Sequence, residues 1–135
     1  QLLPTAKTIV VTTPQISASE VAERSGAVGL QTGQAIFGVI ENMSYLESAG
    51  NRIELFGSGG GELVAKSLSE LSGTNVPLLG QIPISVALRE GSDSGKPLVA
   101  ENSGDLAANA IVEIAQKIAG AGRELAGKKL PLSTK

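Results

Sequence analysis

The chain has 135 residues, which is enough for one domain with a single hydrophobic core. Its 11 basic and 13 acidic residues give a formal net charge of -2, and only 2% of its residues are aromatic, so it lacks the basic surface and stacking platforms of nucleic-acid-binding proteins. Cysteine and histidine are absent, which excludes disulfides, thiolate chemistry and Cys/His metal sites within these residues.

No apolar run approaches the roughly 20 residues of a membrane span, and the N-terminus lacks a signal-peptide pattern. We therefore predict a soluble, cytoplasmic protein that does not bind membranes. Hydrophobic residues make up 41% of the chain, so Val, Ile, Leu and Ala must build the core, as is typical of buried parallel strands. The sequence begins at Gln1 and enters an apolar segment at once, which we interpret as a cut inside a longer protein.

The first predicted elements are a strand and a helix. Residues 7–13 read KTIVVTT, a β-branched run closed by a proline, as expected for a buried strand. Ser17 and Glu20 then stand three residues apart between two apolar neighbours, the pattern of a capping box with its hydrophobic staple. This pattern predicts a helix that begins at Ser17 and ends within residues 30–33.

Two more predicted strands enclose a second helix. Residues 35–40 (AIFGVI) form a buried strand, and the polar, glycine-bearing stretch over residues 41–61 follows it as a loop. From residue 61 the apolar positions recur at a period of 3.6, which predicts a helix ending at Gly73. Residues 77–82 (PLLGQI) form the third strand, which a proline stops.

The C-terminal part is predicted to be mainly helical. We expect a short helix over residues 85–90, a turn-rich loop over residues 91–97, and a longer helix that begins near Ser103. Residues 1–119 then form one α/β domain in which helices flank a parallel sheet. The glycine- and lysine-bearing residues 120–135 are predicted to be a disordered tail.

Ligands of open α/β sheets lie beyond the carboxyl ends of the strands, where the predicted loops begin at residues 12–15, 41–44 and 83–85. Asn42 in the second loop carries a donor and an acceptor on one planar amide, as reading a purine edge requires. On the residues alone, a role in a turn or a cap is the stronger interpretation of this asparagine.

The glycine run over residues 57–61 precedes a predicted helix, so its N–H groups could face an anion. No Lys-Ser/Thr pair follows it, so it is not a Walker A loop, and we interpret it as a flexible loop. The acidic residues of this region have no metal-ligand spacing, and we interpret them as solvated surface: Glu41, Glu47, Glu54 and Glu62.

Four ordered motifs carry a family resemblance: VTTPQ at residues 11–15, GVIENMSY at 38–45, FGSGGG at 56–61, and GQIP at 80–83, followed by RE at 89–90 and GKP at 95–97. Together they resemble the Mrp/ApbC family over about residues 5–118. That family belongs to the MinD-like branch of P-loop ATPases, which have a Rossmann-like three-layer fold and dimerise with nucleotide at the interface. Its members are associated with iron–sulfur cluster assembly and transfer.

The resemblance implies a site and partners. Asn42 matches the adenine-reading asparagine of this branch, and Pro83 with Ile84 matches the second wall of the base pocket. In the intact protein the resemblance implies ATP and magnesium as cofactors, a homodimer as the assembly, and iron–sulfur recipient proteins as partners.

Two departures from the family pattern limit what this chain can do. The glycine-rich Walker A loop and the magnesium-holding aspartates do not occur in these residues, so we predict that the chain alone has no catalytic residues, does not hydrolyse ATP and binds it weakly. Many relatives carry a Cys-x-x-Cys pair where residues 46–51 read LESAGN, which speaks against cluster ligation by this segment.

Two alternatives remain open: a MinD- or ParA-like positioning ATPase, and a non-catalytic scaffold. The cysteine-free loop favours the first, whereas residues 120–135 lack the apolar stripe of an amphipathic membrane helix.

In the family fold the strand over residues 7–13 lies inside the sheet. We therefore expect Ile9, Val10 and Val11 to form an unpaired edge here, and the chain to self-associate as a two-fold dimer.

Overall fold

The computed structural model describes residues 6–101 and 104–123 of the chain. The elements follow one another as β1 (Lys7–Thr12), α1 (Ile16–Gln31), β2 (Ala35–Asn42), β3 (Leu46–Ser48), β4 (Asn51–Ile53), α2 (Gly60–Ser72), β5 (Leu78–Ile82), α3 (Val86–Asp93), the 3-10 helix η1 (Leu98–Ala100) and α4 (Leu106–Arg123). Strands thus alternate with helices, apart from the β3–β4 hairpin.

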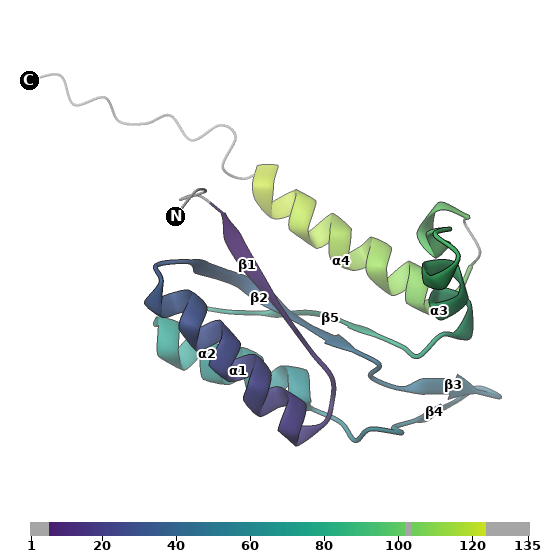
Figure 1. The fold of residues 1–135 in the computed structure, drawn as a ribbon, viewed down its shortest axis with the longest axis horizontal. Coiled ribbons are helices and arrows are strands. Elements are labelled where there is room, and N and C mark those ends of the chain that lie inside the picture. The colour runs from purple at the N-terminus through teal and green to yellow at the C-terminus, as the bar shows by residue number, and fades with distance from the viewer. Residues whose placement is uncertain (1–5, 102–103, 124–135) are drawn as a thin grey trace, which may run out of the picture.

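The main sheet is parallel and has the strand order β1-β2-β5. Helices α1 and α2 cover one face and α4 covers the other, so the molecule has three layers (Figure 1). The register pairs Thr12 with Glu41 and Asn42 with Ile82, which places the carboxyl ends of all three strands at one edge. The predicted α/β fold, a parallel sheet flanked by helices, is confirmed.

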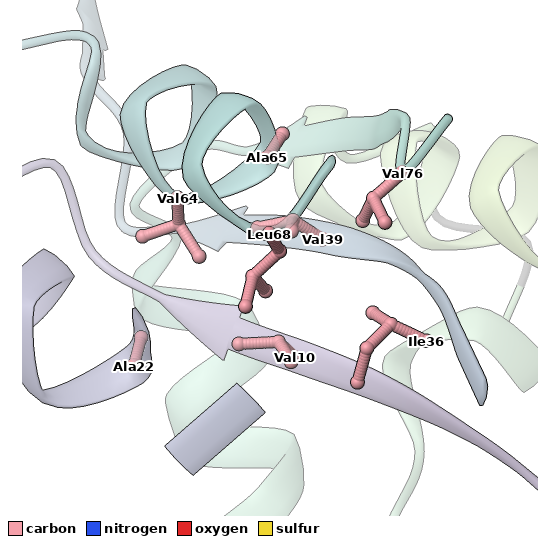
Figure 2. Packing of buried hydrophobic residues seen from close by; sticks show 8 residues of the cluster. All are labelled: Val10, Ala22, Ile36, Val39, Val64, Ala65, Leu68 and Val76. Carbon is pink, nitrogen blue, oxygen red and sulfur yellow. The ribbon is translucent and has the colours of Figure 1, made fainter. Parts of the chain in front are cut away.

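The larger core lies between the sheet and the α1–α2 layer. Leu68 of α2 and Val39 of β2 are fully buried at its centre (Figure 2). Helices α1 and α2 approach closely because Gly26 has no side chain, and a Cβ atom there would lie 2.7 Å from Leu68 Cδ2. This is the packing that a core poor in aromatic residues requires, because small residues let backbones approach.

Helix α4 packs on the opposite face of the sheet, chiefly against β5. A Cβ atom at Gly80 would lie 2.7 Å from Ile114 Cγ1, so the glycine makes room for the helix. At the preceding residue of β5, Lys117 Nζ donates a 2.6 Å hydrogen bond to the carbonyl of Leu79. The lysine therefore anchors α4 to the sheet as well as facing solvent.

The predicted start of α1 is wrong, although its end is confirmed. The helix begins at Ile16, Gln15 is its N-cap residue, and Ser17 is exposed and forms no capping box. Packing decides the start, since a Cβ atom on Gly60 of α2 would lie 2.6 Å from the carbonyl oxygen of Pro14. That close contact fixes the β1–α1 turn, and the helix follows directly from it.

The loop predicted over residues 41–61 contains more regular structure than expected. Strand β2 continues to Asn42, and β3 and β4 form a short antiparallel hairpin. The hairpin turns at Ala49 (φ 49°) and Gly50 (φ 79°), the left-handed pair of a type I′ turn. Its strands have three residues each and are largely exposed, so they carry no hydrophobic alternation that a sequence pattern could reveal.

The C-terminal helices also differ in length from the prediction. Helix α3 continues to Asp93, and α4 continues to Arg123, past residue 119 where the predicted domain ends. The rest of the predicted tail, residues 124–135, lies outside the described residues. Within residues 6–101 and 104–123, no helix combines the length and the apolar character that crossing a membrane requires.

Candidate functional site

The loops that leave β2 and β5 form a cavity of about 350 Å³. Its walls come from the end of β2, the β5–α3 loop and α3, and the lining residues are Asn42, Met43, Pro83, Ile84, Ser85, Val86, Leu88, Arg89 and Ser92. We call this space the base cavity. The structure thus brings Asn42, Pro83 and Ile84 together around one cavity.

Asn42 stands at the carboxyl end of β2 with its amide orientation fixed. Its Oδ1 accepts a 2.9 Å hydrogen bond from the backbone N–H of Met43, which only an oxygen can accept. The amide oxygen keeps a second lone pair, and Nδ2 has no hydrogen-bond partner among the described residues. Asn42 therefore offers one donor and one acceptor to a ligand.

Met43, which follows, adopts a left-handed conformation with φ 55°. Such a conformation costs a non-glycine residue about 1–2 kcal/mol and is concentrated at functional sites.

Backbone hydrogen bonds join the two walls of the base cavity. The hydroxyl of Ser44 donates to the carbonyl of Glu41 at 2.9 Å, and the Ser44 N–H donates to the carbonyl of Ile82 at 3.0 Å. The N–H of Ile84 in turn donates to the carbonyl of Tyr45 at 2.7 Å. The turn after β2 and the loop after β5 are thus one hydrogen-bonded unit.

The third wall, α3, is tied to α4 by a pair of side chains. Ser85 Oγ accepts the N–H of Leu88 at 3.0 Å as the N-cap of α3, and it donates to Asp105 Oδ2 at 2.8 Å. Asp105 Oδ1 accepts the N–H groups of Ala107 at 2.8 Å and Ala108 at 3.2 Å, which caps α4. Asp105 is not among the predicted site residues, although an aspartate before a Leu-Ala-Ala run is an N-cap signal.

The interpretation of Glu41 as solvated surface is wrong. Its side chain is 1% exposed, Oε2 accepts the N–H of Gly61 at 2.6 Å, and Oε1 accepts Gln81 Nε2 at 2.8 Å. Strand β2 continues two residues beyond its predicted end and so includes Glu41. The Glu41 side chain lies on the side of the strand that faces α2. The predicted exposure of the other acidic residues of this region is confirmed for Glu47, Glu54 and Glu62.

The glycines of residues 57–61 have two structural roles: some adopt left-handed backbone conformations, and one lies against the Glu41 carboxylate. Gly57 and Gly59 have φ values of 82° and 83°, which favour glycine, and Gly61 faces the Glu41 carboxylate. The N–H of Gly61 is thus already bonded to a carboxylate of the same chain. Among the described residues, no group of three or more Cys, His, Asp or Glu could hold a metal ion.

A second cavity, of about 540 Å³, runs along β1 and α1. We call it the edge cavity because β1 is the outer strand of the sheet on that side. Val11 and Val21, which line it, are 57% and 60% exposed, so its wall is apolar and open to solvent. Asn42 also lines the edge cavity, which places the two cavities next to each other.

Two curated relatives are similar to this chain in sequence. The iron-sulfur cluster carrier protein of Mycobacterium leprae is 50% identical over 133 residues, which are 98% of this chain and 35% of that protein. The protein of the same name from Synechocystis is 41% identical over 123 residues, 89% of this chain and 33% of that protein. The chain therefore spans about a third of the length of these curated relatives.

A solved structure supports the fold assignment. MinD from Pyrococcus horikoshii, in complex with Mg-ADP, matches with a TM-score of 0.60 and 28% identity, over 93% of this chain and 44% of that one. A family model described as ParA: NUBPL iron-transfer P-loop NTPase matches residues 1–119. These findings confirm the predicted resemblance and show that the chain belongs to the ParA family of P-loop NTPases, within the group described as iron-transfer P-loop NTPases.

Proposed function

We propose that this chain supplies the base-binding side of an ATP site in an iron–sulfur cluster carrier. The observation that carries the proposal is the base cavity, where the end of β2 presents Asn42 opposite the apolar Pro83 and Ile84. Family membership and the Mg-ADP complex of the P. horikoshii MinD support a nucleotide as the ligand.

The chemistry of the cavity suits adenine. The second lone pair of Asn42 Oδ1 can accept the exocyclic amino group of adenine, while Nδ2 can donate to a ring nitrogen. Pro83 and Ile84 offer an apolar surface to the ring. Guanine has a carbonyl where adenine has its amino group, so it would face the amide oxygen with a second acceptor.

The phosphates and magnesium have no matching residues here. A Walker A pattern does not occur in the 135 residues, and the described residues contain no cluster of three or more Cys, His, Asp or Glu that could hold a metal ion. In P-loop ATPases the Walker A loop and the magnesium ion make the main contacts to the phosphates of ATP. We therefore expect this chain alone to bind ATP weakly and not to hydrolyse it.

The cluster is the cargo of the proposed carrier. Because the sequence contains no cysteine, a cluster would need ligands from residues outside it, and recipient iron–sulfur proteins are proposed as partners of the whole protein. The same absence favours a second candidate function, that of a MinD-like positioning ATPase. A cytoplasmic location, where ATP is available, is part of the proposal.

A second copy of the chain is the proposed assembly partner. The outer edge of β1 and the edge cavity present an apolar surface with exposed Val11 beside strand N–H and C=O groups that have no ladder partner in the described residues. Sedimentation equilibrium at micromolar concentration should show a dimer. Val11→Lys should shift it to monomer, whereas Val112→Lys on the exposed face of α4 should not. A monomeric native chain would refute this part of the proposal.

The nucleotide proposal is tested in a hybrid in which this chain replaces the matching segment of the M. leprae relative. Asn42→Ala should weaken ATP binding by about 1–3 kcal/mol, because a buried adenine group loses its partner, and GTP binding by less. Asn109→Ala, on the exposed surface of α4, is the control. Equal losses for ATP and GTP would assign Asn42 to holding the turn instead.

Calorimetry of the 135-residue chain by itself provides the second test. A dissociation constant below about 1 μM, equivalent to roughly 8 kcal/mol, would show that the nucleotide site lies elsewhere in the chain than at the base cavity.

A further inference from the structure

The geometry points to Glu41 as a positioning residue for the base cavity. Its carboxylate holds the end of β2, where Asn42 stands, against the first turn of α2 and against β5, and so it sets where the Asn42 amide lies. This role in ligand binding rests on the proposed function, whereas the effect on the Asn42 turn can be measured without any nucleotide.

Glu41 is the most completely enclosed charged side chain of the described residues, with 1% of its surface exposed. Both of its oxygens are engaged, Oε2 by the Gly61 N–H at 2.6 Å and Oε1 by Gln81 Nε2 at 2.8 Å. A buried carboxylate is tolerated only when hydrogen bonds replace its hydration. The Gly61 N–H, at the partially positive first turn of α2, and the Gln81 amide meet that requirement.

Gly61 leaves the space that Glu41 and Leu78 occupy. A Cβ atom at Gly61 would lie 2.8 Å from Glu41 Cβ, 3.0 Å from Leu78 Cδ1 and 3.1 Å from Glu41 Oε2, so a side chain there would displace the Glu41 carboxylate or Leu78. Gly61 and the buried Glu41 therefore depend on each other. The anion at the first turn of α2 is a side chain of this same chain.

The contacts of Glu41 lie next to the Asn42 turn and hold it in place. Glu41 pairs with Gln81 and Asn42 with Ile82 in the β2–β5 ladder, so the Glu41–Gln81 side-chain bond lies beside the last backbone pair. The carbonyl of Glu41 also accepts the Ser44 hydroxyl, which closes the turn from the other side. Asn42 and the left-handed Met43 are held between these two attachments.

Glu41→Gln is the informative substitution, since it keeps the shape of the side chain. The glutamine oxygen can still accept the Gly61 N–H, and the exposed Gln81 amide can turn its oxygen toward the new amino group, but both contacts lose the negative charge that strengthens them. The double variant Glu41→Gln with Gln81→Glu restores an amide–carboxylate pair at the same place. Glu62→Gln, an exposed glutamate in the same first turn of α2, is the matched control.

Hydrogen exchange measured by NMR on this chain gives the first readout. In Glu41→Gln the amides of Gly61 and Met43 should exchange about tenfold faster than in the native chain, relative to core amides such as that of Leu68, and the Asn42 side-chain resonances should shift. The double variant should restore all three signals, and Glu62→Gln should leave them unchanged. A uniform loss of protection, or a change at Gly61 alone, would make Glu41 an ordinary core residue and overturn the proposal.

Gln81→Ala removes only one of the two contacts, so it serves the same measurement if Glu41→Gln fails to fold. In the hybrid protein, Glu41→Gln should raise the Kd for ATP about tenfold, with recovery in the double variant. If the hybrid binds ATP through Asn42 but Glu41→Gln leaves Kd unchanged, the positioning role is refuted. If the native hybrid does not bind ATP, the proposed function fails, and the exchange data still decide the role of Glu41.

Discussion

The contact between α1 and α2 should behave as a coupled pair of residues. Leu68 is fully buried, so Leu68→Ala should destabilise the chain by about 3–5 kcal/mol through lost burial and the cavity left behind. Gly26→Ala would place a methyl group 2.7 Å from Leu68 Cδ2 and 2.8 Å from Cδ1. Overpacking of this kind costs about 1–3 kcal/mol, from which roughly 1 kcal/mol of helix propensity is regained.

The double variant should be more stable than the sum of the two changes predicts. The three atoms nearest to the added methyl all belong to the Leu68 side chain, so Leu68→Ala removes these contacts and the methyl group added at position 26 enters the vacated space. We expect a coupling of about 1 kcal/mol or more from the double-mutant cycle.

Urea denaturation followed by circular dichroism at 222 nm is the appropriate assay, because the chain has no tryptophan and one tyrosine. Should Leu68→Ala prove too unstable to measure, Leu68→Val gives a milder cycle. Additivity within about 0.5 kcal/mol would refute the close α1–α2 packing.

Three further predictions concern single residues. Gly120→Ala should raise stability by about 0.5–1 kcal/mol in the same denaturation assay, because this exposed position in α4 has open space around it, and a loss would contradict the helix there. Gly38→Ala should lower stability by about 1–3 kcal/mol, since its Cβ would lie 2.6 Å from Leu79 Cγ; unchanged stability would show that β5 lies farther away. Ser85→Ala should cost about 1–2 kcal/mol through loss of the α3 cap and of the bond to Asp105, and adding Asp105→Ala should cost about 1 kcal/mol more through loss of the α4 cap, whereas no further loss would contradict that cap.

The family resemblance named the expected site residues, whereas the residue pattern alone predicted only the loops that carry them. Asn42, Pro83 and Ile84 stand just where strands end, and the ends of parallel strands share one edge of a sheet. Their common cavity follows from this topology, although the identity of its ligand remains our proposal.

By itself the sequence determined the order and type of the main elements, because hydrophobic period and closing prolines or glycines act within a few residues. It also determined that neither cysteine nor histidine chemistry occurs in the chain. The sequence likewise determined where α1 and α2 end. Gly33 and Gly73 follow these helices and adopt positive φ values that other residues avoid.

Only the tertiary structure decided the burial of Glu41, the start of α1 and the joining of α3 to α4. Glu41 meets partners that lie 20 and 40 residues away in the chain, and Ser85 meets Asp105 across 20 residues. A polar residue at the end of a strand has the same local pattern whether a helix covers it or water does. The difference depends on which backbone arrives opposite it, and that is fixed by packing between elements distant in sequence.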